Sequence, residues 1–114
     1  MTAATAAKQV TQLALMAPAT TPTVYAIAQN VANQTVRPAT TGRKDMLFVS
    51  NANGKIYVKL GATATSTSRT FTLPSIGARV WLSQVTGVGL GWDGRVDCIF
   101  ELAGAGTMQV TEML

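Results

Sequence analysis

The sequence predicts an all-β protein that folds as a single β-sandwich or jelly-roll-like domain of about seven short strands. Three observations support this prediction. The chain has 114 residues, which is enough for one hydrophobic core and too short for two cores joined by a linker. From residue 23 onward, short segments alternate apolar and polar positions, which is the period of a half-buried strand. Turn-forming residues separate these segments, and no convincing helical pattern occurs among them.

Residues 1–22 are predicted to form an arm outside the sandwich, which comprises residues 23–114. Val10 and Leu13 have helical spacing, which places a thin apolar stripe on one side of a short helix. That stripe is too narrow to stabilise the helix alone, and the prolines that follow favour extended backbone. The arm is therefore either extended or partly helical, and either disordered or ordered against a neighbouring subunit.

The expected strands share a two-residue alternation of apolar and polar side chains and end at turn-forming residues. In chain order they comprise residues 23–31, 43–51, 55–60, 69–74, 78–85, 95–102 and 107–114. The Met46–Val49 run is apolar at every position, which predicts a strand buried at the centre of a sheet. Asn53 and Gly54 predict a tight hairpin turn, because both residues tolerate positive φ.

The same alternation assigns one face of each strand to the core. The side chains expected to point inward are Ile56, Val58, Leu60, Phe71, Leu73, Val80, Leu82, Val96, Cys98, Phe100, Met108 and Val110. Tyr57 is expected to face solvent, as are Asp97 and Glu101 on a later strand. Gly61 ends its strand, and the polar loop of residues 62–68 that follows has little to pack except its threonines, so it is available to a partner.

The residue types that carry most enzyme chemistry are scarce. Histidine is absent, which removes the commonest general base and metal ligand. Asp97 and Glu101 would lie about 13 Å apart on a strand, farther than the roughly 5–9.5 Å of glycosidase carboxylate pairs. Cys98 is the single cysteine, so it is expected to be a buried, inert thiol without a disulfide partner. We therefore expect no catalytic, metal-binding or cofactor-binding residues, and no enzyme activity.

The composition favours a protein partner. Charged residues make up 12% of the chain, which has a net charge of +4 and a pI near 9.7. The cations are scattered, and only Arg43 and Lys44 are adjacent, so a nucleic acid is not the expected partner. A weakly charged surface rich in Thr, Ser, Asn and Gln is suited to packing against other protein. No apolar run reaches the roughly 20 residues that span a bilayer, so we expect no membrane association.

Eight residues are candidates for a protein interface. They combine the apolar stripe of the arm, the adjacent cations and the larger aromatic side chains. The candidates are Val10, Leu13, Tyr25, Arg43, Lys44, Tyr57, Trp81 and Trp92. Aromatic residues are common anchors of interfaces. Two other interpretations of the aromatic residues stay open, namely a place in the core or a platform that stacks on a sugar or a base.

Two stretches of the chain resemble small virion proteins of tailed bacteriophages: "MLFVSNANGKIYVKLGATATSTSRTFTL" and "GRVDCIFELAGAGTMQVTEML". The shared pattern is a strand ending in Asn, a hairpin into an aromatic strand, a Ser/Thr loop before a Phe-containing strand, a Gly-initiated strand and a final "VTE". In this sequence the elements are Asn51, Tyr57–Gly61, Ala64–Phe71, Gly94–Phe100 and Val110–Glu112. The resemblance covers residues 43–112 and leaves the arm outside.

The resemblance implies a structural protein of a capsid or of a tail or fibre assembly. The leading expectation is a capsid decoration (cement) protein, made in the bacterial cytoplasm and located on the virion surface. It would form a homo-oligomer, expected to be a trimer, and use its arm to grip the major capsid protein or a neighbouring copy. The alternative is a tail, connector or head-fibre component in which Trp81, Trp92 and Tyr57 contact a host glycan. A third hypothesis, single-stranded nucleic-acid binding, depends on the net charge and the tyrosines.

Overall fold

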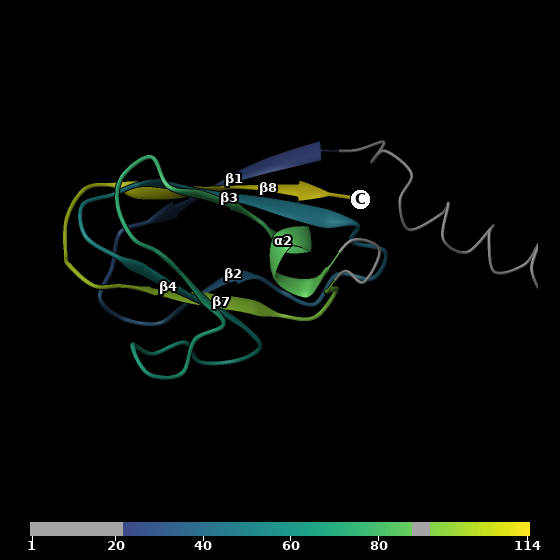
Figure 1. Ribbon diagram of the computed structural model, residues 1–114, viewed down its shortest axis with the longest axis horizontal. Helices are drawn as coiled ribbons and strands as arrows, with labels where there is room; N and C mark the ends of the chain where they lie inside the picture. Colours follow the sequence, from purple (N-terminus) through teal and green to yellow (C-terminus); the bar gives the residue numbers. More distant parts are fainter. Residues whose placement is uncertain (1–21, 88–91) are drawn as a thin grey trace, which may run out of the picture.

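Two antiparallel sheets of four strands lie face to face in the computed structural model, which describes residues 22–87 and 92–114 (Figure 1). One sheet has the strand order β1-β8-β3-β6 and the other has the order β2-β7-β4-β5. The elements are β1 (Pro22–Ala28), β2 (Gln34–Arg37), β3 (Asp45–Asn51), β4 (Ile56–Leu60), β5 (Phe71–Leu73), β6 (Arg79–Trp81), α2 (Leu82–Thr86), β7 (Val96–Phe100) and β8 (Thr107–Met113). This arrangement confirms the predicted all-β sandwich. Of the predicted arm, residues 1–22, residues 1–21 lie outside the described residues, and Pro22 is the first residue of β1.

Strand β2 is the one strand that the sequence does not predict. It has four residues, and its pairing with β7 contains an irregularity between Thr35 and Arg37. Such a short, bulged segment carries too few alternating positions to be recognised as a strand. It occupies the edge of its sheet, beside β7.

The segment expected to be one strand over residues 78–85 divides into β6 and the short helix α2. The reason lies in the side chain of Asp45 on β3, which accepts hydrogen bonds from the Ser83 backbone N–H at 3.0 Å and from the Ser83 hydroxyl at 2.9 Å. These bonds satisfy backbone and side-chain groups of the first helical turn. Leu82 remains fully buried, so the inward position predicted for it is confirmed although its element is a helix.

The core lies between the two sheets and contains the side chains that the alternation predicts. Phe48 of β3 and Phe71 of β5 meet edge to face across the sandwich, with ring centres 5.2 Å apart. Aromatic pairs in this geometry stabilise a fold beyond the burial of their area. The fully enclosed predicted positions are Ile56, Val58, Leu73, Leu82, Val96, Cys98, Phe100, Met108 and Val110. Leu60, Phe71 and Val80 are partly buried against this cluster.

Gln29, which directly follows β1, joins two loops at one end of the sandwich. Its side chain is buried and donates hydrogen bonds to the carbonyls of Leu102 at 2.9 Å and Asn53 at 3.3 Å, and it accepts one from the Gly106 N–H at 3.0 Å. Three backbone groups of two hairpin loops are thereby satisfied. A Cβ at Gly106 would lie 2.7 Å from the Cα of Ala52, so the close approach of these loops requires glycine there.

Candidate interaction surfaces

The outer surface of sheet β1-β8-β3-β6, called the A face below, carries a row of mostly apolar side chains. Strand register places Val24 of β1 opposite Thr111 of β8. It also places Leu47 of β3 between Thr111 and Trp81 of β6. Side chains at opposite positions of paired strands share one face of a sheet, so this row crosses the full width of the sheet. The outward position expected for Trp81 is confirmed.

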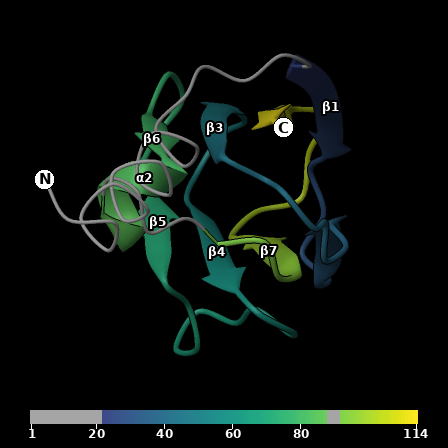
Figure 2. The same cartoon turned by 90° about the vertical axis from the view of Figure 1, so that its right-hand side faces the viewer.

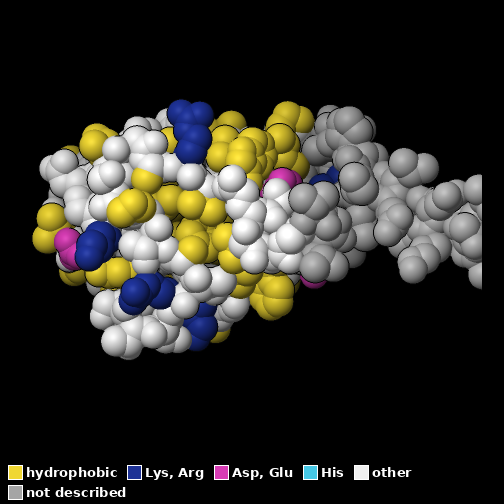
Figure 3. All heavy atoms as spheres, in the orientation of Figure 1, with side chains coloured by type: hydrophobic (Ala, Val, Ile, Leu, Met, Phe, Trp, Pro, Cys, Tyr) yellow, Lys and Arg dark blue, Asp and Glu magenta, His cyan; other side chains and the backbone are white. Residues whose placement is uncertain are grey.

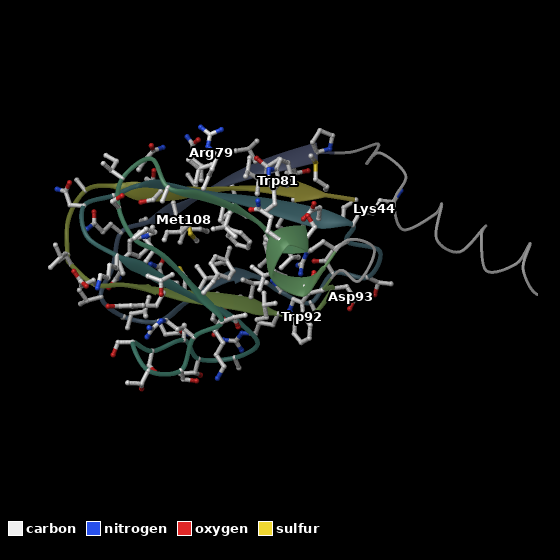
Figure 4. All side chains as sticks on the ribbon, viewed as in Figure 1. Lys44, Arg79, Trp81, Trp92, Asp93 and Met108 are labelled. Atoms are coloured by element: carbon white, nitrogen blue, oxygen red, sulfur yellow. The ribbon has the colours of Figure 1, made fainter. Side chains whose placement is uncertain are left out.

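The A face carries little charge. Beside the first row lies a second, in which register aligns Ala26, Gln109, Val49 and Arg79. Among the outward side chains of these four strands, only Asp45 and Arg79 are charged. Asp45 is engaged with Ser83, so the exposed Arg79 supplies the formal charge at the rim. Figure 3 views this sheet edge-on along its upper margin, where hydrophobic side chains lie beside Lys or Arg, and Figure 4 shows Arg79 projecting from the outer side.

The apolar run Met46–Val49 is explained by the A face. Met46 and Phe48 are fully buried between the sheets, whereas Leu47 and Val49 point outward and are half-buried. The prediction of a central strand is correct, because β3 lies between β8 and β6. The expectation of burial on both sides is not met within the described residues. Apolar side chains on the outer side of a central strand are typical of a surface that another protein covers.

The opposite sheet presents a hollow on its outer surface, with a volume of about 310 Å³. Its lining comprises Val31, Tyr57, Thr65, Ser66, Ile99, Phe100 and Glu101. The Tyr57 hydroxyl donates to the Glu101 carboxylate at 3.1 Å, and the Arg69 guanidinium lies 5.2 Å from the centre of the Tyr57 ring. Partial desolvation raises the pKa of Tyr57, as do the hydrogen bond and the negative charge of Glu101, while Arg69 lowers it. An aromatic ring beside a carboxylate in a hollow is chemistry that can bind a sugar.

Asp97 is buried, which corrects its predicted place on a solvated strand face. Arg95 donates to both carboxylate oxygens, at 2.7 and 2.9 Å. The Asn33 amide and the Thr63 backbone N–H also donate to Asp97, at 3.0 and 2.7 Å. Burial alone would raise the pKa of Asp97, but these hydrogen bonds and the charge of Arg95 hold it below its usual value. The physical reason for the burial is the loop after β4, which folds back over this end of β7.

This loop is also more firmly held than expected. Gly61 donates its N–H to the carbonyl of Arg95 at 2.8 Å, and Ala64 donates to the Asn33 side chain at 2.8 Å. Ala64 is 1% exposed. The expectation that residues 62–68 pack only through their threonines is therefore wrong, because backbone groups and one buried alanine anchor the loop. Its tip, with Thr65 and Ser66, borders the hollow described above.

Arg43 is also buried, which removes it from the candidate interface. Its Nε donates to Glu112 at 2.8 Å, and its terminal nitrogens donate to the carbonyls of Trp92, Gly94 and Pro38 at 3.1, 2.8 and 2.9 Å. A buried guanidinium is tolerated when it is paired and hydrogen-bonded in this way. The Arg43 side chain therefore holds several segments together inside the protein, and its adjacency to Lys44 in the sequence does not create a basic patch.

The other candidate residues lie in different places. Tyr25 is half-buried on the inner side of β1, with the Arg37 guanidinium 4.2 Å from its ring centre. Lys44 is half-buried and directly precedes β3. Trp92 is 36% exposed, and its indole N–H donates to the carbonyl of Arg95 at 3.1 Å. Val10 and Leu13 lie outside the described residues.

The three aromatic residues of the glycan hypothesis do not form one platform. Trp81 lies on the A face, and Tyr57 lies on the outer side of the other sheet. Trp92 packs on Gly94, where a Cβ would lie 2.6 Å from the indole ring. Figure 4 shows Trp81 and Trp92 on opposite sides of α2. A glycan site would therefore depend on Tyr57 and its neighbours in the hollow, without the two tryptophans.

Sequence reasoning missed the rest of the A face and the buried polar groups. Leu47, Val49 and Val24 share the A face with Trp81. The sequence contains a signal for Leu47 and Val49, because their strand is apolar at both its inward and its outward positions. Glu112 and Asp97 gave no such signal, because their partners come from distant segments. Arg43 and Glu112 are 69 positions apart in the chain.

Comparisons of the chain with protein-family models, curated proteins and solved structures found no significant match. Among the described residues, no helix is long and apolar enough to cross a membrane. In the same part of the chain, no group of three or more His, Cys, Asp or Glu side chains could hold a metal ion. The fold and surfaces define an all-β sandwich of two four-stranded sheets with a weakly charged, apolar outer face on one of them.

Proposed function

We propose that this protein is a non-enzymatic structural protein of a tailed-bacteriophage virion, and that it is a decoration (cement) protein bound to the outside of the major capsid shell. The observation that carries the proposal is the A face, whose mostly apolar side chains cross a whole sheet and whose exposed formal charge is Arg79 at the rim. The resemblance of residues 43–112 to small virion proteins supports the choice of partner.

Such a protein acts by burying surface. Each Å² of apolar area removed from water contributes about 25 cal/mol, so covering Val24, Leu47 and Trp81 against the major capsid protein stabilises the bound state. No bond is made or broken. The predicted arm, residues 1–22, would add contact area at the cost of its ordering entropy. Copies distributed over the shell, as the expected trimers or in another oligomeric state, would together resist the outward pressure of packaged DNA.

The proposal is tested by co-sedimentation with expanded shells of the cognate phage that lack this protein. We expect the wild-type chain to bind, and Trp81→Ala to weaken binding by about tenfold or more, which is typical of a central aromatic anchor. Trp92→Ala is the matched control, because it removes the other tryptophan from a different surface and should change binding by less than about twofold. Failure of the wild-type chain to bind shells, or equal loss in both variants, would overturn the assignment of the A face.

A second experiment addresses the arm. Deletion of residues 2–22 should abolish attachment to shells while the sandwich still unfolds cooperatively at a similar temperature. Unchanged occupancy of the truncated protein on shells would show that the arm takes no part in attachment, and the A face would then carry the contact alone.

The hollow beside Tyr57 favours a second candidate function, a tail or head-fibre component that binds a host glycan. The Tyr57 hydroxyl and the Glu101 carboxylate would hydrogen-bond sugar hydroxyls, and the Tyr57 ring would stack on the sugar face. Calorimetric titration with host-surface polysaccharide tests this function. Binding that is lost in Glu101→Gln and retained in Trp81→Ala would support it, and absence of heat across a panel of polysaccharides would reject it.

A further inference from the structure

Among the described residues, no strand pairs with the outer edge of β1, and this edge differs from the other three sheet edges. It has seven residues, none of them charged, and its pairing with β8 runs without a bulge. By contrast, β5 and β6 have three residues each, and β2 has four residues with an irregular register. Figure 2 shows β1 at one margin of the sandwich with no other described strand beyond it. Proteins usually shorten, bulge or charge their edge strands, or place proline on them, to prevent pairing with another chain. Strand β1 is long, regular and uncharged, and its one proline, Pro22, lies at its first residue.

The register identifies which backbone groups of β1 point to this edge. Gln29 donates its N–H to the carbonyl of Gly106 at 3.0 Å and continues the β1–β8 register. In an antiparallel ladder alternate residues face opposite sides, so residues 23, 25 and 27 bond to β8 like Gln29. Val24, Ala26 and Ala28 therefore direct their N–H and C=O groups to the open edge, together with the C=O of Pro22.

Two groups on this edge are already accounted for. Pro22 has no N–H. The carbonyl of Ala28 accepts a hydrogen bond from the Gln34 side chain at 2.7 Å. The edge therefore offers three donors, the N–H groups of Val24, Ala26 and Ala28, and three acceptors, the carbonyls of Pro22, Val24 and Ala26.

We propose that this edge pairs with β1 of a second copy of the chain, antiparallel about a two-fold axis that passes beside Tyr25. In this register Val24 lies opposite Ala26 of the second copy, and Pro22 lies opposite Ala28. Each of the three donors on one copy meets one of the three acceptors on the other, which gives six hydrogen bonds across the axis. The missing N–H of Pro22 falls opposite the Ala28 carbonyl that Gln34 already occupies.

Neighbouring registers fit less well. An axis centred on Val24 leaves the N–H of Ala28 without a partner among the described residues. An axis centred on Ala26 directs the N–H of Val24 at the Ala28 carbonyl, which Gln34 already uses. Each of these registers forms four unshared hydrogen bonds in place of six. Only the register centred on Tyr25 pairs every free donor of one β1 with a free acceptor of the other. Such self-complementarity is what an isologous two-fold contact requires.

Side chains are compatible with the same register. Val24 is 65% exposed and would lie beside the small Ala26 of the second copy, so the two A faces would join into one continuous surface. On the inner side, the two Tyr25 rings would meet at the axis. Strand β1 itself carries no charge. The Arg37 guanidinium, 4.2 Å from the Tyr25 ring centre, would come near the axis in both copies, and each is paired with its own Glu112 at 3.3 Å. The resulting dimer differs from the trimer expected above, and the inference depends on the strand edge alone, independently of the proposed virion function.

The oligomeric state of the full chain in solution tests the inference. Light scattering and sedimentation should give twice the chain mass of 11.9 kDa. Ala26→Pro removes one edge N–H, and Val24→Lys adds charge near the axis; each should raise the dissociation constant of the dimer by about tenfold or more. Val31→Lys is the control, since this valine is 52% exposed and lies on another surface, and it should remain dimeric. A monomer at about 100 µM, or a trimer insensitive to both variants, would overturn the proposal.

A cross-linking experiment tests the register itself. Residues at position 25 would form a non-hydrogen-bonded pair across the axis, with Cα atoms about 4.5 Å apart, within the range that a disulfide spans. Under oxidation, Tyr25→Cys should therefore give a covalent dimer in high yield. Thr23→Cys should not, because position 23 lies opposite position 27 of the second copy. Cys98 is buried and serves as an internal control in the wild-type chain. Efficient cross-linking through Thr23→Cys and none through Tyr25→Cys would reject this register.

Discussion

The Nε atom of Arg43 lies 2.8 Å from Oε2 of Glu112, and both side chains are at most 1% exposed. Glu112 belongs to β8, whereas Arg43 lies in the connection between β2 and β3. Arg37 approaches the same carboxylate, with its Nε 3.3 Å from Oε1. One carboxylate therefore pairs with two guanidinium groups at this end of the sandwich, one of them fully buried and the other 23% exposed.

Replacing Glu112 with glutamine should destabilise the fold by about 3–5 kcal/mol, because it leaves buried cationic charge without a compensating anion. Urea denaturation monitored by tryptophan fluorescence measures the loss. Glu101→Gln is the control, since Glu101 is exposed and its replacement should change the unfolding free energy by no more than about 0.5 kcal/mol. Equal stability of both variants would show that the buried ion pair contributes nothing.

The stability of the protein should decrease in acid partly through Asp97. The pKa of Asp97 is lower in the folded state than in the unfolded state. Its contribution is therefore complete above the ordinary aspartate pKa of about 3.9 and is lost as the pH falls through the lowered folded value. Urea denaturation of wild type and Asp97→Asn should show a stability difference at pH 7 that narrows below about pH 4. A difference that is constant with pH would contradict this assignment.

The alternation within single strands was sufficient to predict most of the core. Ile56 and Val58 are fully buried as expected, because the two-residue period of a half-buried strand is a local property of the sequence. Strand β2 was missed, since four residues and a bulge provide too little of that pattern. The second half of the strand expected over residues 78–85 is α2 in the structure, because Asp45, distant in sequence, holds Ser83 in a helical turn.

The candidate surfaces were less predictable for a related reason. The alternation of β7 places Asp97 on the outer side of its strand. Nothing in the neighbouring sequence predicts that the loop containing Thr63 covers this carboxylate. Likewise, the sequence predicts Arg43 to be one of two adjacent surface cations. In the structure it is buried and paired with Glu112, which is 69 positions away in the chain. Trp81 was correctly placed outward, because its position depends only on the parity of β6 relative to the core.

The thiol of Cys98 should be unreactive in the folded protein. Burial, together with the negative charge of Asp97, raises the pKa of Cys98 to about 12, so almost no thiolate is present at pH 8. A thiol reagent such as 5,5′-dithiobis(2-nitrobenzoic acid) should label the native protein only as fast as it opens, and the denatured protein at once. Labelling of the native chain within seconds would show that Cys98 is accessible.

The two glycines near Gln29 should respond differently to alanine, because different atoms stand in the way. A Cβ at Gly106 would meet the Ala52 Cα at 2.7 Å, and backbone cannot move aside cheaply, so Gly106→Ala should cost about 1–3 kcal/mol. A Cβ at Gly104 would meet the end of the Gln29 side chain at 2.7 Å, which is flexible. A Cβ at Gly106 would also meet the Gln29 side-chain oxygen at 2.8 Å, besides the backbone of Ala52 and Asn51 at 2.7 Å. In a Gln29→Ala background, Gly104→Ala should therefore cost nothing further, whereas Gly106→Ala should keep most of its cost because the backbone contacts remain. Urea denaturation of the three single and two double variants measures this. Equal rescue of both glycine variants by Gln29→Ala would mean that the Gly106 contact involves the side chain and not the backbone.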